Sequence, residues 1–599
     1  MLLDNHHQFS FRATISLILL FCSFTLVTCK KQPEEMKAST ETLLSDPFLQ
    51  LPQQDSVRVV WFTEFEGSRH YVSYGEDTQK QVEATTTKLT HLQEDQKSLV
   101  GEQTEEGQIY QKPQKRDIWR HEAEVTGLKP NTSQPYFVSS VDAEGGVVSS
   151  ETFTLASKPQ PGTPLKILLT SDHQSKPMVA ANLEKVEETI GKVDGIFFAG
   201  DLVNIPDRAS EWFDDNRGGA FFPALQGRAS YELTTSGSPT PYQGGQLIQN
   251  APLYTAIGNH EVMGRRDGDL DLNQQFEATL PRFIAEKTYL RQKVRVNPQN
   301  DSQIKEAWIK SNSFNTETYQ ELFTLPISKS GQEKYYAVTF GDVRLVVLYA
   351  TRIWRVPGLN PKKKGKYRET EEDVNSPQQW GYGQHIFEPI QEGSNQYQWL
   401  KSELQSPEFN QAKYKIVMFH HPPHSLGENV IPAYTDPVQI VERDEEEEVT
   451  AVRYEYPQDQ DHLLRDIVPL LEKAGVQLVH YGHSHLWNRF VGPKGMHFLE
   501  TSNVGNSYGA YLGDKKRKIP KDYQENYVAT GNPGGLEPVV PNLAPLKDEA
   551  GKALPYIASN EITVFSILDT GKGTVTSYYF DTRKPESEVV EFDQFSLLK

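Results

Sequence analysis

The chain has 599 residues, with 61 lysines and arginines against 80 aspartates and glutamates, and its formal net charge is -19. Hydrophobic residues make up 37% of the sequence and aromatic residues 11%. This composition is typical of a soluble globular protein of roughly two to four domains, and it excludes a protein with many membrane spans or a chain disordered throughout. The negative charge argues against general nucleic-acid binding, because a phosphate polyanion would be repelled on average.

Residues 1–28 predict an export signal. The stretch 13–28 is one apolar run, too short to span a bilayer comfortably and placed like the hydrophobic part of a secretory signal. Residues 26–29 (LVTC) resemble a bacterial lipobox, in which Cys29 becomes the lipidated first residue of the mature chain. Simple cleavage after the apolar run is the alternative. We therefore expect an exported protein, periplasmic or at the cell surface, with residues 29–45 as a tether and Cys29 as a membrane anchor where it is lipidated.

Residues 46–158 predict a β-sandwich domain. Short apolar segments alternate with turns and show no helical period. About a hundred residues of such strands are typical of two packed antiparallel sheets. A proline-rich stretch, residues 156–164, then marks a linker. The clearest strands are expected at residues 57–63, 71–75, 134–138 and 151–155.

Residues 165–585 predict an α/β domain. An apolar strand at 167–169 precedes a helix at 177–192 with one apolar stripe, and a strand at 196–199 follows, which is a βαβ unit. A second helix is expected at 461–474. Further strands are expected at 253–257, 337–350, 414–419 and 476–481, with a hairpin over 562–580.

Five polar clusters each follow an apolar strand of this domain. Loops converge at the carboxyl ends of strands in open α/β folds, so side chains far apart in sequence would meet at one edge. Carboxylates, carboxamides and imidazoles, without a thiolate, are ligands that a pair of borderline metal ions uses. Each cluster alone is equally explained by a turn or a hydrogen-bonded loop histidine, but five in order favour a metal site. The clusters are residues 171–174 (SDHQ), 200–204 (GDLVN), 258–261 (GNHE), 420–423 (HHPP) and 482–485 (GHSH).

In this order, the clusters resemble those of the calcineurin-like metallophosphoesterase superfamily and, within it, the purple acid phosphatases. The resemblance covers roughly residues 45–505 and leaves out the long insertions and the tail. It implies an N-terminal β-sandwich of the fibronectin-III-like type, followed by a four-layer α/β metallophosphoesterase domain with two mixed β-sheets flanked by helices. Outside the clusters, the matching segments are residues 57–63, 74–75, 125–132, 335–343 and 398–400.

The resemblance also implies two metal ions bridged by the carboxylate of Asp201. His420 is chosen over His421, because His420 fits the His-x-Pro register of the family. His260 resembles the histidine that contacts the phosphate and protonates the leaving group. Arg489 fits the spacing of a further catalytic residue, with a surface arginine as the equal alternative. The other ligands would be Asp172 and His485 at the first metal, and Asn259, His420 and His483 at the second.

Two positions depart from the family pattern. Asn204 stands where the purple enzymes have a tyrosine, so no phenolate is present there to stabilise ferric iron. Gln174 stands where related phosphoesterases have a histidine, and its neutral amide is a weaker ligand. We include both among the expected metal ligands, with His173 as an alternative. The expected ions are two divalent or trivalent cations drawn from Fe, Zn and Mn.

The sequence therefore predicts an exported two-metal enzyme that hydrolyses small phosphate monoesters by means of metal-activated hydroxide. A phosphodiesterase of the same superfamily is the near alternative. A catalytically degenerate, surface-anchored binding protein is the alternative from another class, and only the departures at Asn204 and Gln174 favour it. Insertions at residues 206–252, 262–334 and 424–460 follow the site clusters, and we expect them to form the walls of the substrate pocket.

Overall fold

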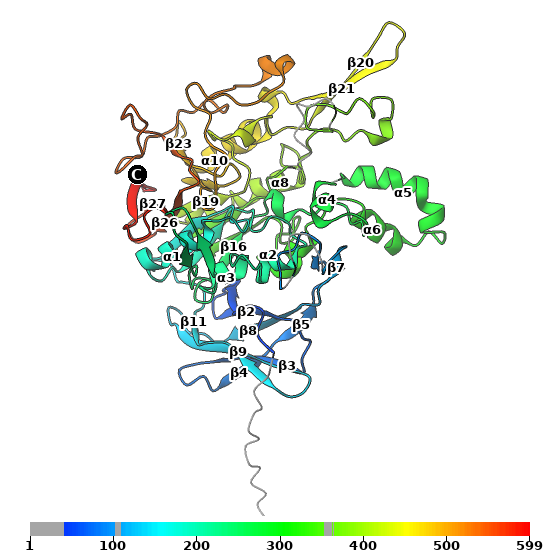
Figure 1. The fold of residues 1–599 in the computed structure, drawn as a ribbon. Coiled ribbons are helices and arrows are strands. Elements are labelled where there is room, and N and C mark those ends of the chain that lie inside the picture. The colour runs from blue at the N-terminus through cyan, green and yellow to red at the C-terminus, as the bar shows by residue number, and fades with distance from the viewer. Residues whose placement is uncertain are drawn as a thin grey trace, which may run out of the picture.

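The computed structural model describes residues 41–101, 103, 109–278, 280–352, 362 and 364–598. The expected export signal, Cys29 and most of the expected tether lie outside these residues. No helix in the described ranges is long and apolar enough to cross a membrane. Figure 1 shows a β-rich N-terminal part in blue and cyan beside a larger part that mixes strands and helices.

A four-stranded and a five-stranded sheet form the N-terminal sandwich. Their strands are β1 (Phe48–Gln50), β2 (Ser56–Thr63), β3 (Arg69–Tyr74), β4 (Lys80–Glu83), β5 (Thr85–Lys88), β8 (Trp119–Thr126), β9 (Gln134–Val141), β10 (Val147–Ser149) and β11 (Phe153–Leu155). The strand orders are β1-β2-β8-β5 and β10-β9-β3-β4, with β11 paired to β9. Val59 and Trp61 of β2 are buried in one cluster with Val72 and Tyr136 of the other sheet, because alternate residues of a strand share a face. The predicted β-sandwich is confirmed.

The first sheet of the second domain has six strands in the order β16-β13-β12-β26-β27-β28. They are β12 (Lys166–Thr170), β13 (Gly195–Phe198), β16 (Leu253–Thr255), β26 (Ile562–Asp569), β27 (Thr574–Asp581) and β28 (Val590–Ser596). β12, β13 and β16 are parallel, whereas β26, β27 and β28 add antiparallel pairings. Helix α1 (Val179–Ile190) connects β12 to β13 and buries Leu183 and Val186 of its apolar stripe.

The second sheet has seven strands in the order β17-β18-β19-β22-β24-β23-β25. They are β17 (Tyr336–Phe340), β18 (Val343–Val347), β19 (Tyr414–Met418), β22 (Leu478–Tyr481), β23 (Trp487–Val491), β24 (His497–Thr501) and β25 (Tyr556–Ile557). The single strand expected at 337–350 is wrong, because β17 and β18 form an antiparallel hairpin that turns at Gly341, whose φ is 58°. Before β22, helix α10 (Val468–Ala474) extends a π-helical segment, Leu463–Ile467, and ends at Gly475 with φ 75°.

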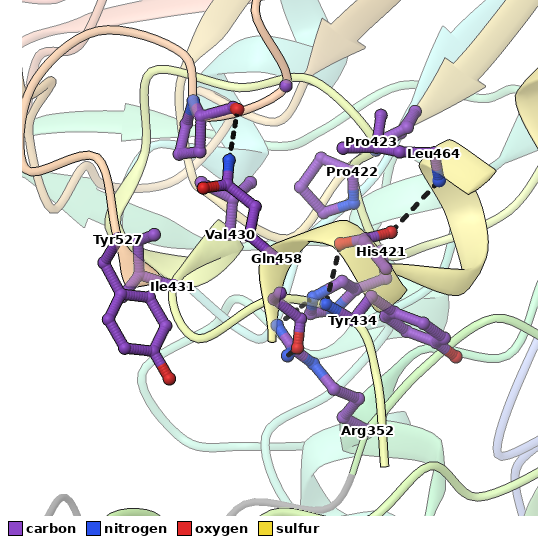
Figure 2. Close-up of a pocket in the computed structure, with 14 residues that line it drawn as sticks. Arg352, His421, Pro422, Pro423, Val430, Ile431, Tyr434, Gln458, Leu464 and Tyr527 are labelled. Atoms are coloured by element: carbon purple, nitrogen blue, oxygen red, sulfur yellow. Dashed lines mark hydrogen bonds between the residues drawn. The ribbon is translucent and has the colours of Figure 1, made fainter. Parts of the chain in front are cut away.

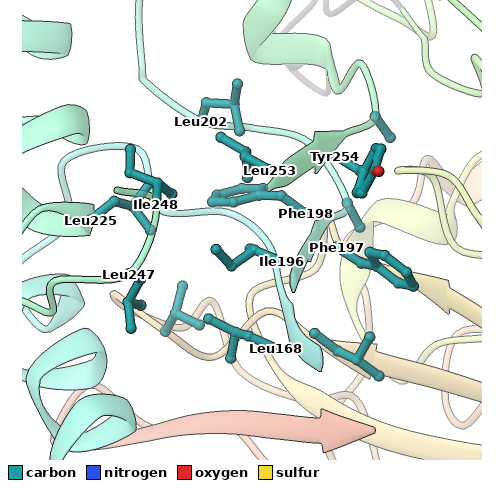
Figure 3. Packing of buried hydrophobic residues seen from close by; sticks show 14 of the residues in the cluster. Leu168, Ile196, Phe197, Phe198, Leu202, Leu225, Leu247, Ile248, Leu253 and Tyr254 are labelled. Carbon is teal, nitrogen blue, oxygen red and sulfur yellow. The ribbon is translucent and has the colours of Figure 1, made fainter. Parts of the chain in front are cut away.

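The two sheets of the second domain pack face to face. Phe197 and Val564 of the first sheet share one buried cluster with Leu345, Ile416 and Leu478 of the second. Figure 3 shows part of this cluster around β13, where aromatic and aliphatic side chains interdigitate. Helices α8 (Asn395–Glu403) and α10 supply apolar side chains to a separate cluster on the other face of the second sheet, and α1 contacts β26 of the first. The predicted four-layer arrangement is confirmed.

The insertions add helices around this core. The insertion at residues 206–252 packs Phe213 and Phe222 against Phe62 of the sandwich, with 5.0 and 5.2 Å between ring centroids. It therefore joins the two domains. Helices α5 and α6 extend to one side in Figure 1. The elements of the insertions are α2 (Ala209–Phe213), α3 (Phe221–Leu225), β14 (Tyr231–Leu233), β15 (Thr240–Tyr242), α4 (Leu272–Glu277), α5 (Arg282–Val296), α6 (Ser302–Ser311), α7 (Glu317–Leu322), β20 (Val438–Arg443) and β21 (Val449–Glu455), and α9 (Pro407–Gln411) follows α8 outside them.

Candidate metal centre

Loops that follow parallel strands of both sheets meet at one place. Asp172 follows β12 and Asp201 follows β13, whereas Asn259 begins a short 3-10 turn, η1 (Asn259–Glu261), after β16. His420 and His483 follow β19 and β22 of the other sheet. The backbone N–H of His483 donates to both carboxylate oxygens of Asp172, at 2.9 and 3.1 Å, across 311 positions of sequence. The fold therefore brings the sequence-predicted clusters into direct contact.

Three buried side chains form a possible metal-binding cluster: Asp201, His420 and His483. One ligand atom from each lies within 4.8 Å of the others. The Nε2 atom of His420 is 3.2 Å from Oδ2 of Asp201 and 3.0 Å from Nδ1 of His483. A carboxylate oxygen and two imidazole nitrogens that converge in this way are a suitable donor set for a borderline cation.

The other ring nitrogen of His420 fixes its orientation. Nδ1 lies 2.8 Å from the carbonyl oxygen of Ala199, so it carries a proton and leaves Nε2 to face Asp201. Burial lowers the pKa of His420, but the charge of Asp201 outweighs burial and raises the pKa to about 10. Without a cation, His420 therefore holds a second proton beside the carboxylate. A bound cation would replace that proton.

Asp172 and His485 form the neighbouring part of the centre. Nε2 of His485 is 3.4 Å from Oδ1 of Asp172. Nδ1 of His485 is 2.8 Å from the amide oxygen of Asn506, so this imidazole too is oriented through its second nitrogen. The ring of Tyr508 stacks on His485 with 4.4 Å between ring centroids.

Two buried amide oxygens of the motif clusters have no hydrogen-bond partner among the described residues. They are Oε1 of Gln174 and Oδ1 of Asn259. Gln174 is held through its Nε2, which donates to Oδ2 of Asp201 at 2.7 Å. A buried acceptor without a donor is costly, whereas a cation would satisfy both oxygens. The residues present therefore fit the pair of metal ions that the family resemblance implies.

Glycines in two of the motifs let the ligands approach the backbone. A Cβ atom at Gly258 would lie 2.2 Å from Oδ1 of Asp201, and one at Gly482 would lie 2.2 Å from Oδ2 of Asp172. Any side chain at these positions would displace a carboxylate. The glycine that precedes Asn259, and the one that precedes His483, thus belong to the architecture of the centre.

The backbone is left-handed at several ligands. The φ angles are 56° at Asp172, 59° at Asp201, 84° at His483 and 54° at His485. Non-glycine residues rarely adopt this conformation, and each costs on the order of 1–3 kcal/mol when the surroundings impose it. Such a concentration of strained residues is typical of a functional site.

Glu261 fixes the loop that carries Asp201. Its carboxylate accepts hydrogen bonds from the backbone N–H groups of Asp201, Leu202 and Gly258 at 2.7–2.8 Å. Burial and the charge of Asp201 raise the pKa of Glu261 to about 8. Burial also raises the pKa of Asp201, but the imidazoles of His420 and His260 outweigh it and hold that pKa below its usual range. The Asp201 carboxylate is therefore the ionised member of this pair.

His260 lies at the more open side of the centre. Its side chain is 22% exposed, against 2% for Asp201. Nδ1 lies 2.7 Å from the carbonyl oxygen of Asn204, and Nε2 lies 4.0 Å from Oδ2 of Asp201. The ring of Phe276, from the second insertion, stacks on the imidazole at 5.1 Å. His260 is thus oriented to exchange a proton or a hydrogen bond with a group bound beside Asp201.

Asn204 and His173 make other contacts than the predicted ones. The amide of Asn204 donates to the backbone oxygen of Gln174 at 2.5 Å and accepts from Nζ of Lys176 at 3.1 Å. Its oxygen therefore has a partner, and the contacts do not place it among the ligands. His173 points into the core, where its Nε2 lies 3.1 Å from Oγ1 of Thr170 and its ring packs against Phe198.

His421 lies behind the cluster. Nη2 of Arg352 donates to Nε2 of His421 at 2.6 Å, and the His421 ring packs 4.3 Å from the ring of His483. Figure 2 shows His421 beside Arg352 in a small pocket, whose cavity volume is about 20 Å³. Since the Nε2 lone pair is taken by an arginine, His421 supports His483 from behind. The contacts of the pair agree with the choice of His420 as the ligand.

Arg489 lies outside the centre. Its guanidinium forms two hydrogen bonds to the carboxylate of Asp593, at 2.7 and 3.0 Å, and lies over the ring of Phe595. Both members of the ion pair are buried. These contacts give Arg489 a structural role in joining β23 to β28, and its catalytic role stays a prediction. The alternative of a surface arginine is wrong, because the side chain is buried.

Several residues of the centre were missed by the sequence reasoning. Glu261 and Lys176 stand within or directly after motif clusters, so a search for charged groups near each motif would have found them. Phe276 of α4, and Asn506 and Tyr508 after β24, lie in segments without a motif. Only the fold shows that Phe276 contacts His260 and that the other two contact His485.

Together, the β-sandwich, the two-sheet domain and the cluster of carboxylates, amides and imidazoles define a metallophosphoesterase. A family model for calcineurin-like phosphoesterases matches residues 165–486, and one for the N-terminal domain of purple acid phosphatases matches residues 45–156. The first match covers more than half of the chain, so the protein belongs to the calcineurin-like phosphoesterase family. It is a metal-dependent phosphatase, and the family uses two metal ions.

Two solved structures show how far the similarity extends. Purple acid phosphatase PPD1 from yellow lupin (Lupinus luteus) seeds is 14% identical, with a TM-score of 0.48 over 92% of this chain and 74% of that chain. GAP50, described as the anchor in the inner membrane complex of Plasmodium, is 11% identical, with a TM-score of 0.29 over 72% of this chain and 89% of that chain. No curated protein matches the chain.

Proposed function

We propose that the protein is an exported phosphatase that hydrolyses small phosphate monoesters at the centre around Asp201. The observation that carries the proposal is the convergence of Asp201, His420 and His483, with one ligand atom of each within 4.8 Å of the others. The unpaired oxygens of Gln174 and Asn259 beside them argue against a degenerate site, because a site without a cation would leave both unsatisfied.

The residues of the chain divide the chemistry between them. A pair of Fe, Zn or Mn ions would supply hydroxide near neutral pH and neutralise charge on the phosphoryl group. Asp201 has two carboxylate oxygens, which suits it to lie between two ions. His260 would act through Nε2, because Nδ1 donates to the carbonyl of Asn204. Burial lowers the pKa of His260, whereas the charge of Asp201 opposes this. A bound phosphate anion would favour the imidazolium, whose Nε2 proton could then pass to the leaving oxygen.

Metal analysis combined with a pair of chromogenic substrates tests the proposal. The purified protein would be freed of metal with a chelator, loaded with Fe, Zn or Mn, and assayed with p-nitrophenyl phosphate and bis(p-nitrophenyl) phosphate over several pH values. We expect two metal ions per chain and faster hydrolysis of the monoester. A preference for the diester would make the protein a phosphodiesterase, and a loaded protein inactive on both would overturn the hydrolase proposal.

Export and lipidation are separate proposals, supported by the apolar run at 13–28 and the lipobox-like residues 26–29. Cell fractionation of the wild type and Cys29→Ser would test both. We expect the wild type in a membrane fraction outside the cytoplasm, and the variant in soluble exported form. A wild-type chain that stays in the cytoplasm would refute export.

A further inference from the structure

Lys176 lies beside the metal centre and has no role in the phosphatase chemistry described so far. It stands two residues after Gln174, in a stretch where Gln174 and Ser175 both have left-handed backbone, with φ of 47° and 49°. This turn directs the half-buried Lys176 side chain toward Asn204, whose amide oxygen accepts from Nζ at 3.1 Å. The ammonium group therefore bonds a neutral partner.

The charge of Lys176 is not balanced by direct contact. Within the described ranges, its ammonium forms no ion pair. Glu211, whose charge acts on Lys176, already accepts from Arg208 at 2.9 Å and from the backbone N–H groups of Asn204 and Ile205. The ammonium has three donors and one of them bonds Asn204, so it has donors to offer to an anionic ligand.

The position of the ammonium is well defined. A Cβ atom at residue 505 would lie 2.1 Å from Cβ of Lys176, so Gly505 allows the loop after β24 to pack on the lysine stem. Asn204 holds both groups at the open side: its side chain accepts from Lys176, and its backbone oxygen is bonded to Nδ1 of His260. The lysine and the histidine therefore border the same space beside Asp201.

The neutral amide at Asn204 and the ammonium of Lys176 together make the centre more positive. The family resemblance places an anionic phenolate at position 204, where this chain has a neutral amide with a cation attached. Once two cations are bound, their charge exceeds that of Asp172 and Asp201, and the ammonium adds to the excess. An incoming anion must balance this charge, and a doubly charged phosphate does so better than a singly charged one.

We propose that Lys176 binds a phosphoryl oxygen of the substrate and makes the centre selective for dianionic phosphate monoesters over monoanionic diesters. This inference rests on the proposed phosphatase function and specifies its substrate class. Lysine is a suitable group for the task, because its ammonium is a compact point charge that needs no fixed orientation.

The test compares Lys176→Met and Lys176→Arg with the wild type, all loaded with metal. Calorimetry would measure the binding of inorganic phosphate, and kinetics would measure kcat and KM for p-nitrophenyl phosphate and its diester. We expect Lys176→Met to weaken phosphate binding and raise the monoester KM about 10- to 100-fold, the usual effect of losing a charge-assisted hydrogen bond. The diester KM should change less than about threefold, and Lys176→Arg should recover most of the loss.

Lys192→Met is the matched control, since Lys192 is exposed and its Nζ bonds Oγ1 of Thr154 in the sandwich. It should behave as the wild type. Unchanged phosphate binding by Lys176→Met at full metal content would overturn the inference, and so would loss of metal from that variant, which would make the lysine structural. If the wild type hydrolyses neither ester, the proposed function fails, and the phosphate titration still decides whether Lys176 binds the anion.

Discussion

The two halves of the metal centre are built differently. Around His420 and His483, a carboxylate and two imidazoles converge, and His420 is oriented by a backbone carbonyl. On the side of Asp172, the neutral amide of Gln174 stands where the family resemblance implies a histidine, and the amide oxygen of Asn204 accepts from Lys176. The first half is organised by the fold and ready to hold a cation. The second half has a weaker expected ligand, Gln174, and a positive charge at its open side, Lys176.

The most severe test of this comparison is Asp201→Asn, because Asp201 belongs to both halves. The variant removes the ionised group that faces His420 and accepts the hydrogen bond from Gln174. We expect undetectable phosphatase activity and loss of bound metal, measured by turnover and elemental analysis. Circular dichroism would confirm that the variant is folded. Full metal content with retained activity would contradict the assignment of the centre.

His260→Ala should affect turnover and leave the metals in place. The imidazole is partly exposed and does not share the donor cluster of Asp201, His420 and His483. We expect kcat to fall by roughly 10²- to 10⁴-fold, the usual range for a lost general acid or base. Phe276→Leu, which keeps an apolar contact but removes the stacked ring, serves as a milder companion. A variant of His260 that loses metal would place this histidine among the ligands.

Gln174→His tests whether the neutral amide weakens metal binding on the Asp172 side, because it places an imidazole there. We expect tighter retention of the first metal, by about 10- to 100-fold, since changes in and around metal ligands commonly have this size. Equilibrium dialysis against a graded chelator would measure it, with Gln174→Ala as the variant expected to lose the same metal more easily. Equal metal retention in all three proteins would show that Gln174 is not a ligand.

Arg489→Met has the smallest expected effect on catalysis. The side chain lies in a buried ion pair with Asp593, away from both halves. We expect kcat within about twofold of the wild type, but a loss of about 3–5 kcal/mol in the free energy of unfolding, because Asp593 would be left buried and unpaired. Denaturant unfolding measures this, and the double variant with Asp593→Asn should recover part of it. A large fall in kcat with an unchanged free energy of unfolding would support a catalytic role for Arg489.

The sequence predicted the parts that depend on local pattern. Strand periodicity identified both the sandwich and the βαβ unit, and the motifs brought Asp172, Asp201 and the histidines to one edge. Long-range pairing could not be read in this way. The spacing that suggested Arg489 contains no information about Asp593, which lies 104 residues later. Likewise, nothing at Asn204 indicates that its amide oxygen accepts a hydrogen bond from Lys176.

The strand expected at 337–350 failed for a different reason. The sequence is apolar on both sides of Gly341-Asp342, so the hydrophobic pattern alone predicted one continuous strand across the turn. The left-handed glycine that reverses the chain is a single residue, and one residue carries little weight in a pattern of fourteen. Turn chemistry would have been the better guide there.

The strained ligand loops link this enzyme to the ion supply of its surroundings. Four of the expected ligand residues have left-handed backbone, and the binding of a cation would help to offset the cost of that conformation. An ion that binds only the folded chain adds about 2.7 kcal/mol of stability when its free concentration is a hundred times its dissociation constant. Without the ion, the enzyme would lose this stability as well as its activity. A larger unfolded fraction would then be open to proteolysis, and we expect the amount of protein in the cell to fall with the concentration of the metal.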